Sequence, residues 1–120
     1  MGKWLLALAL AISLNGFAGD ASPDAAELQQ RFNQKYRDYL TPESQALLPF
    51  PALEMAEWNK LLAGRPLQVL YREPGKYYNN KVYTFTLYRA EDGAYYLDAK
   101  GGFWGMDELA YGPLTLEQLQ

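Results

Sequence analysis

Cysteine and histidine are both absent from the 120 residues of this chain. Without histidine, the general base of the serine, histidine and aspartate triad is missing, and without cysteine there is no thiolate nucleophile. The protein ligands that zinc and copper prefer are missing as well. Any catalysis would therefore depend on carboxylate, tyrosine, lysine or serine side chains, and we expect neither a cofactor nor a metal site.

Long hydrophobic runs are scarce, and the clearest one lies near the N-terminus. It extends from Trp4 to Leu14 after a single positive charge at Lys3, and Asn15 ends it. A membrane span needs about 20 apolar residues, so this run is too short. A basic start, a short apolar core and a small-residue region are typical of a secretory signal peptide. We expect a signal peptide over residues 1–21, cleaved near residues 18–21, and a periplasmic or secreted protein without a membrane anchor after cleavage.

An excess of charge of one sign is also missing. The formal net charge is −3, and lysine and arginine form no cluster. Proteins that bind nucleic acids concentrate positive charge, so we expect no nucleic-acid partner. Residues 22–120 suffice for a single small domain. Because disulfides are unavailable to it, this domain must be held by packing, to which the aromatic residues, 15% of the chain, can contribute large apolar areas.

The first part of this domain, residues 23–64, has helical periodicity. Apolar residues recur at every fourth position, which predicts an amphipathic helix from Asp24 to Leu40. The apolar stripe of this helix comprises Leu28, Phe32, Tyr36 and Leu40. A second helix is expected from Ala52 to Ala63, with Gly64 just beyond its C-terminal end.

The second part, residues 67–116, changes to the alternating pattern of β-strands. The strongest strand extends from Lys81 to Ala90, and we expect its face with Tyr83, Phe85 and Leu87 to be buried. The other expected elements are a strand at 67–72, a turn at 73–76, a hairpin turn at Asp92–Gly93, strands at 94–99 and 103–106, and a strand or a helix at 114–120 with Thr115 and Gln118 at capping-box spacing.

Two helices followed by successive hairpins predict the α+β class. Hairpins join antiparallel strands, so the sheet should be an antiparallel meander. We expect a β-meander of three to five strands with the N-terminal helices packed on one of its faces.

Carboxylates in the sheet half could form a pair. Asp107 and Glu108 are consecutive, so a strand would direct them to opposite faces. Asp98 could face one of them from a neighbouring strand. A pair of this kind would allow a carboxylate-dependent hydrolase, because glycosidases hold two carboxyl groups about 5–10 Å apart.

Aromatic rings in the sheet half are too numerous for one sheet face to bury. Alternation directs Tyr88 away from the expected core, and the adjacent Tyr95 and Tyr96 cannot both be buried by the same layer. In the glycine-rich segment 99–113 we expect Trp104, Tyr111 and Asp107 to form a surface patch. The candidate residues for binding a partner or ligand are Trp104, Tyr111, Asp107, Tyr88 and Tyr96. The alternative is ordinary cross-strand pairing on a half-exposed sheet.

These patterns favour a small, exported, non-catalytic binding protein. Its partner would be another envelope or secreted protein, which it would bind as an inhibitor, an immunity-type protein or an accessory subunit. The alternative is a module that binds carbohydrate or peptidoglycan, in which exposed rings stack on sugar faces. A carboxylate-dependent hydrolase is the third hypothesis.

Overall fold

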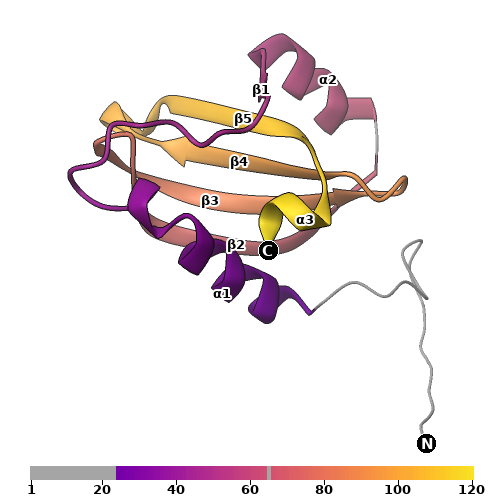
Figure 1. Ribbon diagram of the computed structural model, residues 1–120. Coiled ribbons are helices and arrows are strands. Elements are labelled where there is room, and N and C mark those ends of the chain that lie inside the picture. The colour runs from indigo at the N-terminus through magenta and orange to yellow at the C-terminus, as the bar shows by residue number, and fades with distance from the viewer. Residues whose placement is uncertain (1–23, 65) are drawn as a thin grey trace, which may run out of the picture.

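The computed structural model describes residues 24–64 and 66–120 (Figure 1). The predicted signal peptide lies outside these residues. The elements are α1 (Ala25–Lys35), η1 (Arg37–Tyr39), β1 (Ala52–Leu53), α2 (Met55–Gly64), β2 (Leu67–Tyr78), β3 (Lys81–Ala90), β4 (Tyr95–Gly101), η2 (Phe103–Gly105), β5 (Asp107–Leu114) and α3 (Leu116–Leu119).

The strands form one five-stranded antiparallel sheet in the order β1-β5-β4-β3-β2. Strands β2 to β5 follow one another as a meander, and the short β1 pairs with the outer side of β5. The predicted α+β fold with an antiparallel sheet is therefore confirmed.

The helix α1 begins at a side-chain cap. Asp24 Oδ1 accepts hydrogen bonds from the backbone N–H groups of Ala26 (2.8 Å) and Glu27 (3.4 Å), which satisfies donors that have no partner within the helix. The helix ends at Lys35 rather than at Leu40, and η1 follows it. The predicted apolar stripe is nevertheless correct within the helix, because its members Leu28 and Phe32 are fully buried.

The two long helices do not share one face of the sheet, as Figure 1 shows. On the first face, α1 packs on a layer of buried rings and aliphatic side chains that includes Tyr83, Phe85 and Leu87 from β3. These three side chains were the ones predicted to be buried. On the opposite face, Trp58 of α2 packs on Tyr96 and Ala110. This second cluster covers one end of its face.

One turn prediction in the sheet is wrong. The segment 73–76 continues strand β2 instead of forming a turn, because the register against β3 shifts between Glu73 and Lys76 and Gly75 takes a φ of 73°. A proline and glycine pair fits a bulge as well as a turn. The real turn between β2 and β3 is Asn79–Asn80, both with positive φ, a conformation that asparagine tolerates better than most residues.

The C-terminal segment is the helix of the two predicted alternatives. The N–H of Gln118 donates to Thr115 Oγ1 (3.2 Å), and the N–H of Thr115 donates to Gln118 Oε1 (2.8 Å). This reciprocal pair is the predicted capping box. It starts α3, whose Leu119 is buried in the same core as α1.

Replacing Tyr78 by phenylalanine tests the polar contact inside the first core. The hydroxyl of Tyr78 accepts from the N–H of Leu48 (2.6 Å) and shares a hydrogen bond with the hydroxyl of Tyr111 (2.7 Å). Tyr78→Phe leaves both groups buried without this partner, so we expect a loss of about 1–3 kcal/mol in the free energy of unfolding, measured in urea. The matched control Tyr77→Phe alters a half-exposed ring and should change little; equal losses in both variants would contradict this role of the Tyr78 hydroxyl.

Candidate functional site

A polar cleft lies on the second face of the sheet, beyond the end that α2 covers. Its volume is about 490 Å³. Strands β2 to β5 all contribute to its floor, α2 adds Leu62 and the loop after β4 adds Gly105. The polar residues that line it include Arg72, Thr86, Tyr88, Asp98, Lys100 and Glu108.

The register of the sheet brings these residues together. Asp98 on β4 lies opposite Thr86 on β3 and Ala110 on β5. Lys100, two residues further along β4, lies opposite Glu108. Because alternate residues of a strand share a face, all of these side chains belong to the face that carries Trp58.

Asp98 is the unusual residue of the cleft. Its exposed fraction is 6%, and among the described residues its Oδ1 has no hydrogen-bond partner. Its side chain is hydrogen-bonded to Glu108. Burial, with that hydrogen bond and the charge of Glu108, raises the pKa of Asp98 to about 8, although Lys100 and Arg72 act in the opposite direction. The raised pKa favours the protonated form of Asp98.

Glu108 connects this acid to the helix α2. The indole Nε1 of Trp58 donates to Glu108 Oε2 (3.3 Å). The buried Trp58 ring in turn packs against Tyr88 and Tyr96, with ring centroids 5.5 and 6.0 Å away. Glu108 thus accepts hydrogen bonds from Asp98 and from Trp58. The two carboxyl groups are in direct contact, whereas those of a glycosidase stand apart.

Arg72 and Tyr88 form the other side of the cleft. Arg72 Nε donates to Thr86 Oγ1 (3.2 Å). Burial raises the pKa of the half-buried Tyr88, and the neighbouring Arg72 guanidinium partly offsets this. Arg72 and Lys100 are cationic and Glu108 is acidic, so charged groups of both signs line the same hollow.

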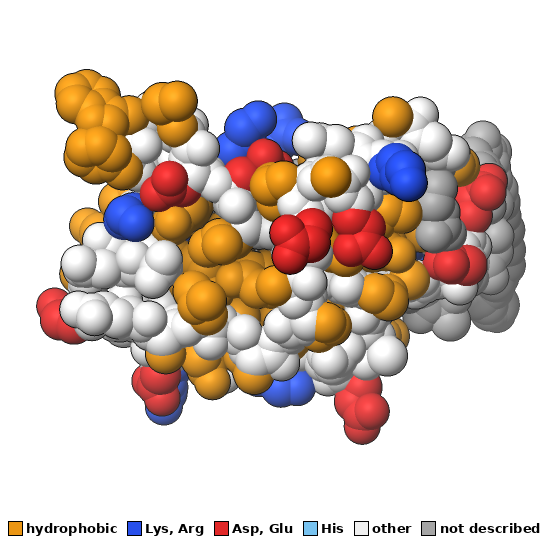
Figure 2. Space-filling model, turned by 90° about the horizontal axis from the view of Figure 1, so that it is seen from above, with side chains coloured by type: hydrophobic (Ala, Val, Ile, Leu, Met, Phe, Trp, Pro, Cys, Tyr) orange, Lys and Arg blue, Asp and Glu red, His pale blue; other side chains and the backbone are white. Residues whose placement is uncertain are grey.

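The loop between β4 and β5 borders this cleft and projects from the molecule. It was predicted to be a strand at 103–106, but Gly102, Trp104 and Gly105 have φ values of 67°, 60° and 70°, which a strand does not allow. The exposed fractions are 64% for Phe103, 80% for Trp104 and 82% for Met106. Figure 2 shows a group of hydrophobic side chains projecting beyond the body at one end.

Asp107 holds this loop at its base. Its Oδ2 accepts from the N–H of Phe103 (3.3 Å) and pairs with Lys81 Nζ (3.4 Å). A Cβ atom at Gly102 would lie 2.5 Å from that same oxygen, so glycine is required there both for space and for φ. The contacts of Asp107 are thus with Phe103 and Lys81, and they hold the base of the loop.

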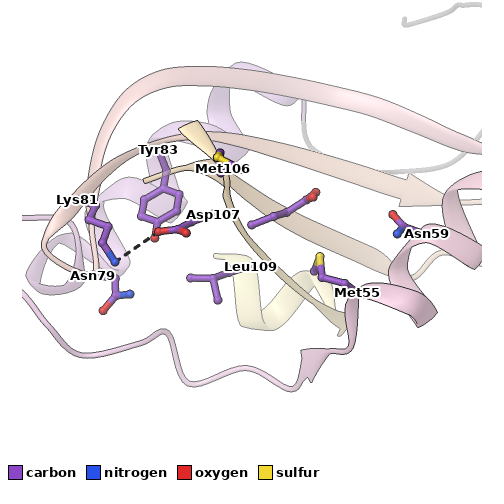
Figure 3. A pocket seen from close by; sticks show the side chains of 9 residues that line it. Met55, Asn59, Asn79, Lys81, Tyr83, Met106, Asp107 and Leu109 are labelled. Atoms are coloured by element: carbon purple, nitrogen blue, oxygen red, sulfur yellow. Dashed lines mark ion pairs between the residues drawn. The ribbon is translucent and has the colours of Figure 1, made fainter. Parts of the chain in front are cut away.

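A second hollow, about 500 Å³, lies along β5 between the α2 residues Met55 and Asn59 and the turn residue Asn79 (Figure 3). The ion pair between Lys81 and Asp107 borders it, together with Met106 and Leu109. The base of the projecting loop is therefore shared by the two hollows.

The structure separates the five predicted site residues. Trp104 lies in the exposed loop, Asp107 begins β5 directly after that loop, and Tyr88 lines the cleft. Tyr96, a predicted binding candidate, is buried against Trp58, while Tyr95 is buried in the first core, so the two rings belong to different layers as expected.

Tyr111 is also buried, which corrects its predicted place in the surface patch. Alternation along β5 directs Tyr111 to the first core, where it meets Tyr78, and Phe50 in the segment before β1 packs against its ring. Burial and the hydrogen bond with Tyr78 raise the pKa of its phenol above the usual value.

Sequence reasoning missed part of the site and anticipated another part. The sequence left open whether Asp98 faces Asp107 or Glu108 from a neighbouring strand, and in the structure its side chain is hydrogen-bonded to Glu108. Arg72 and Thr86 were missed, although the even spacing of Thr86 from Tyr88 and its polar character placed it on the same face. The exposure of Phe103 and Met106 was missed because the segment was interpreted as a strand.

Comparison of the chain with protein-family models, with curated proteins and with solved structures gave no match. Within residues 24–64 and 66–120, His, Cys, Asp and Glu side chains form no group of three or more that could hold a metal ion. In the same residues no helix has the length and apolar character needed to cross a membrane.

Replacing Asp98 by asparagine should remove a pH dependence from stability. The folded protein holds the Asp98 proton up to a pKa of about 8, whereas the ordinary pKa of 3.8 applies to the unfolded chain. Between these values the folded state binds more protons, so the wild-type free energy of unfolding falls as pH rises. An asparagine amide donates to Glu108 at every pH. Relative to wild type, we expect Asp98→Asn to gain on the order of a few kcal/mol between about pH 4 and 8.

Urea denaturation across this pH range measures the difference. The groups that face Asp98 are Glu108, Lys100, Arg72 and Tyr88, and Asp38→Asn, on the surface at η1, provides the matched control. Parallel pH profiles for wild type and Asp98→Asn would contradict the assignment.

Proposed function

We propose that this protein is an exported, non-catalytic binding protein that contacts a partner protein of the envelope or the extracellular space through the loop Gly102–Met106. The role would be that of an inhibitor, an immunity-type protein or an accessory subunit. The observation that supports it best is the exposure of three large apolar side chains, Phe103, Trp104 and Met106, in one short loop.

The backbone conformation of the loop and its contacts with Asp107 hold these three side chains in their exposed positions. Trp104 has a φ of 60°, and a non-glycine residue in such a region costs on the order of 1–3 kcal/mol unless its surroundings hold it there. The hydrogen bond from Phe103 to Asp107 and the ion pair of Asp107 with Lys81 supply that support. A fixed loop loses little conformational entropy when it binds, which favours affinity.

The composition of the loop also fits a protein partner. Tryptophan is enriched among the residues that contribute most to binding energy at interfaces, and aromatic residues and methionine are enriched in interface cores. The rings of Phe103 and Trp104 meet edge to face at 5.4 Å, so they form one unit. Val82 extends the apolar surface, since its carbonyl accepts from the N–H of Gly102 (2.8 Å) and its side chain is half-exposed. A partner with an apolar pocket would fit this surface.

Site-specific photo-crosslinking tests the proposal and requires no candidate partner. A benzophenone amino acid would replace Trp104 in the full chain, expressed in a bacterial host with its envelope intact. The control carries the same group at Leu47, which is half-exposed and lies outside the loop. We expect a discrete adduct with one protein from position 104 and none from position 47. The same adducts from both positions, or none from position 104, would contradict the proposal.

Once that partner is purified, Trp104→Ala should weaken its binding by at least about tenfold, as expected for a central aromatic anchor. Leu47→Ala should leave the affinity unchanged, and isothermal titration calorimetry compares the two. An unchanged affinity in Trp104→Ala would show that the loop lies at the margin of the interface or outside it.

A further inference from the structure

The cleft on the second face has a feature that packing does not explain. Asp98 is more than nine-tenths buried, and its Oδ1 has no hydrogen-bond partner within residues 24–64 and 66–120. An unsatisfied buried polar atom costs free energy. Ala110, which lies opposite Asp98 on β5, is buried and shows that a small apolar side chain fits on this face of the sheet. An acid at position 98 is therefore unfavourable for folding alone, which suggests that it has a use.

The second feature is the mixture of groups around Asp98. The hydroxyls of Thr84, Thr86 and Tyr88 both donate and accept hydrogen bonds, and Lys100 donates only. Asp98 and Glu108 together hold a proton between two carboxyl groups. The cleft thus offers donors and acceptors side by side, with charged groups of both signs among them.

We propose that this cleft binds a neutral, hydroxyl-rich small molecule, a mono- or disaccharide, whose hydroxyl groups hydrogen-bond to Glu108, Asp98 and the threonine hydroxyls around them. This ligand site is separate from the protein contact of the loop, and it goes beyond the proposed function.

The dimensions and the walls of the cleft suit such a ligand. Its volume of about 490 Å³ lies within the range of about 300–1,000 Å³ that is typical of small-molecule sites. Leu62 of α2 supplies an apolar wall, against which the C–H face of a sugar ring can pack. The hydroxyl-rich floor lies on rigid, paired strands, which hold the hydrogen-bonding groups in place.

Charged ligands fit the cleft less well. A cation would approach Arg72 and Lys100, and an anion would approach the Glu108 carboxylate. Neither would find a region of uniform opposite charge. A neutral molecule meets no such repulsion, and each of its hydroxyl groups can both donate and accept.

The indole N–H of Trp58 provides a direct reporter, because it donates to Glu108. The chain contains tryptophans at positions 4, 58 and 104, and Trp58→Phe identifies the resonance of Trp58 in a ¹H–¹⁵N NMR spectrum. The full chain would be titrated with glucose, maltose, N-acetylglucosamine and its β-1,4-linked dimer. Inorganic phosphate and the diamine putrescine serve as charged probes.

We expect at least one of the four saccharides to shift the Trp58 resonance saturably, with no saturable shift from phosphate or putrescine. Glu108→Gln should weaken this binding by at least about tenfold, since it removes the negative charge and replaces one acceptor oxygen with an amide donor. Glu117→Gln makes the same chemical change at an exposed position of α3 and should bind as wild type does. Lys100→Ala is a second cleft variant, on an exposed side chain, should Glu108→Gln fail to fold.

Three results would overturn the proposal. The first is a Trp58 resonance that none of the four saccharides shifts up to about 50 mM, a concentration that would reveal binding much weaker than a Kd of about 1 mM. The second is a saturable shift caused by phosphate or putrescine instead. The third is equal saccharide affinity in Glu108→Gln, or in Lys100→Ala if that variant is used, and in Glu117→Gln, which would place the ligand elsewhere.

Discussion

The packing of Trp58 on the second face of the sheet is the contact on which the functional surface depends. It fixes α2 over one end of that face through the rings of Tyr88 and Tyr96. Its indole N–H also holds Glu108, the acceptor of the buried acid Asp98. Because α2 covers only that end, a cleft of about 490 Å³ remains beside it. A single side chain thus covers part of the sheet, supports a wall of the cleft and donates a hydrogen bond to the candidate site.

The two faces of the sheet differ in composition, because α1 and α3 cover the first face whereas α2 covers only one end of the second. The first face packs rings and aliphatic side chains against α1 and α3, with the hydroxyls of Tyr78 and Tyr111 satisfied by one another. It supplies the apolar burial that a cysteine-free domain needs. The second face carries the acid pair and the cations. The loop Gly102–Met106 rises from the edge of that cleft, so the proposed protein contact and the proposed ligand site are neighbours.

Local signals in the sequence predicted much of the fold. The alternation in Lys81–Ala90 and the spacing of Thr115 and Gln118 each have a local cause, and both were confirmed. Predictions failed where one sequence is compatible with two backbone conformations. Pro74–Gly75 suits both a turn, which was predicted, and the bulge that β2 contains. The burial of Tyr111 depends on contacts with the segment before the short strand β1, which pairs with β5. The local sequence pattern did not predict that strand. The pairing of Asp98 with Glu108 depends on register, which hairpin spacing indicates only approximately.

The most direct test of this buried acid pair is the titration of the Asp98 carboxyl itself, followed by ¹³C NMR in the intact protein. Asp98→Asn identifies its resonance. We predict that Asp98 stays protonated at neutral pH and titrates near pH 8, as burial against Glu108 requires. A carboxyl that titrates near the ordinary value of 3.8 would contradict this prediction, because Asp98 would then be solvated and the cleft would lack its buried acid.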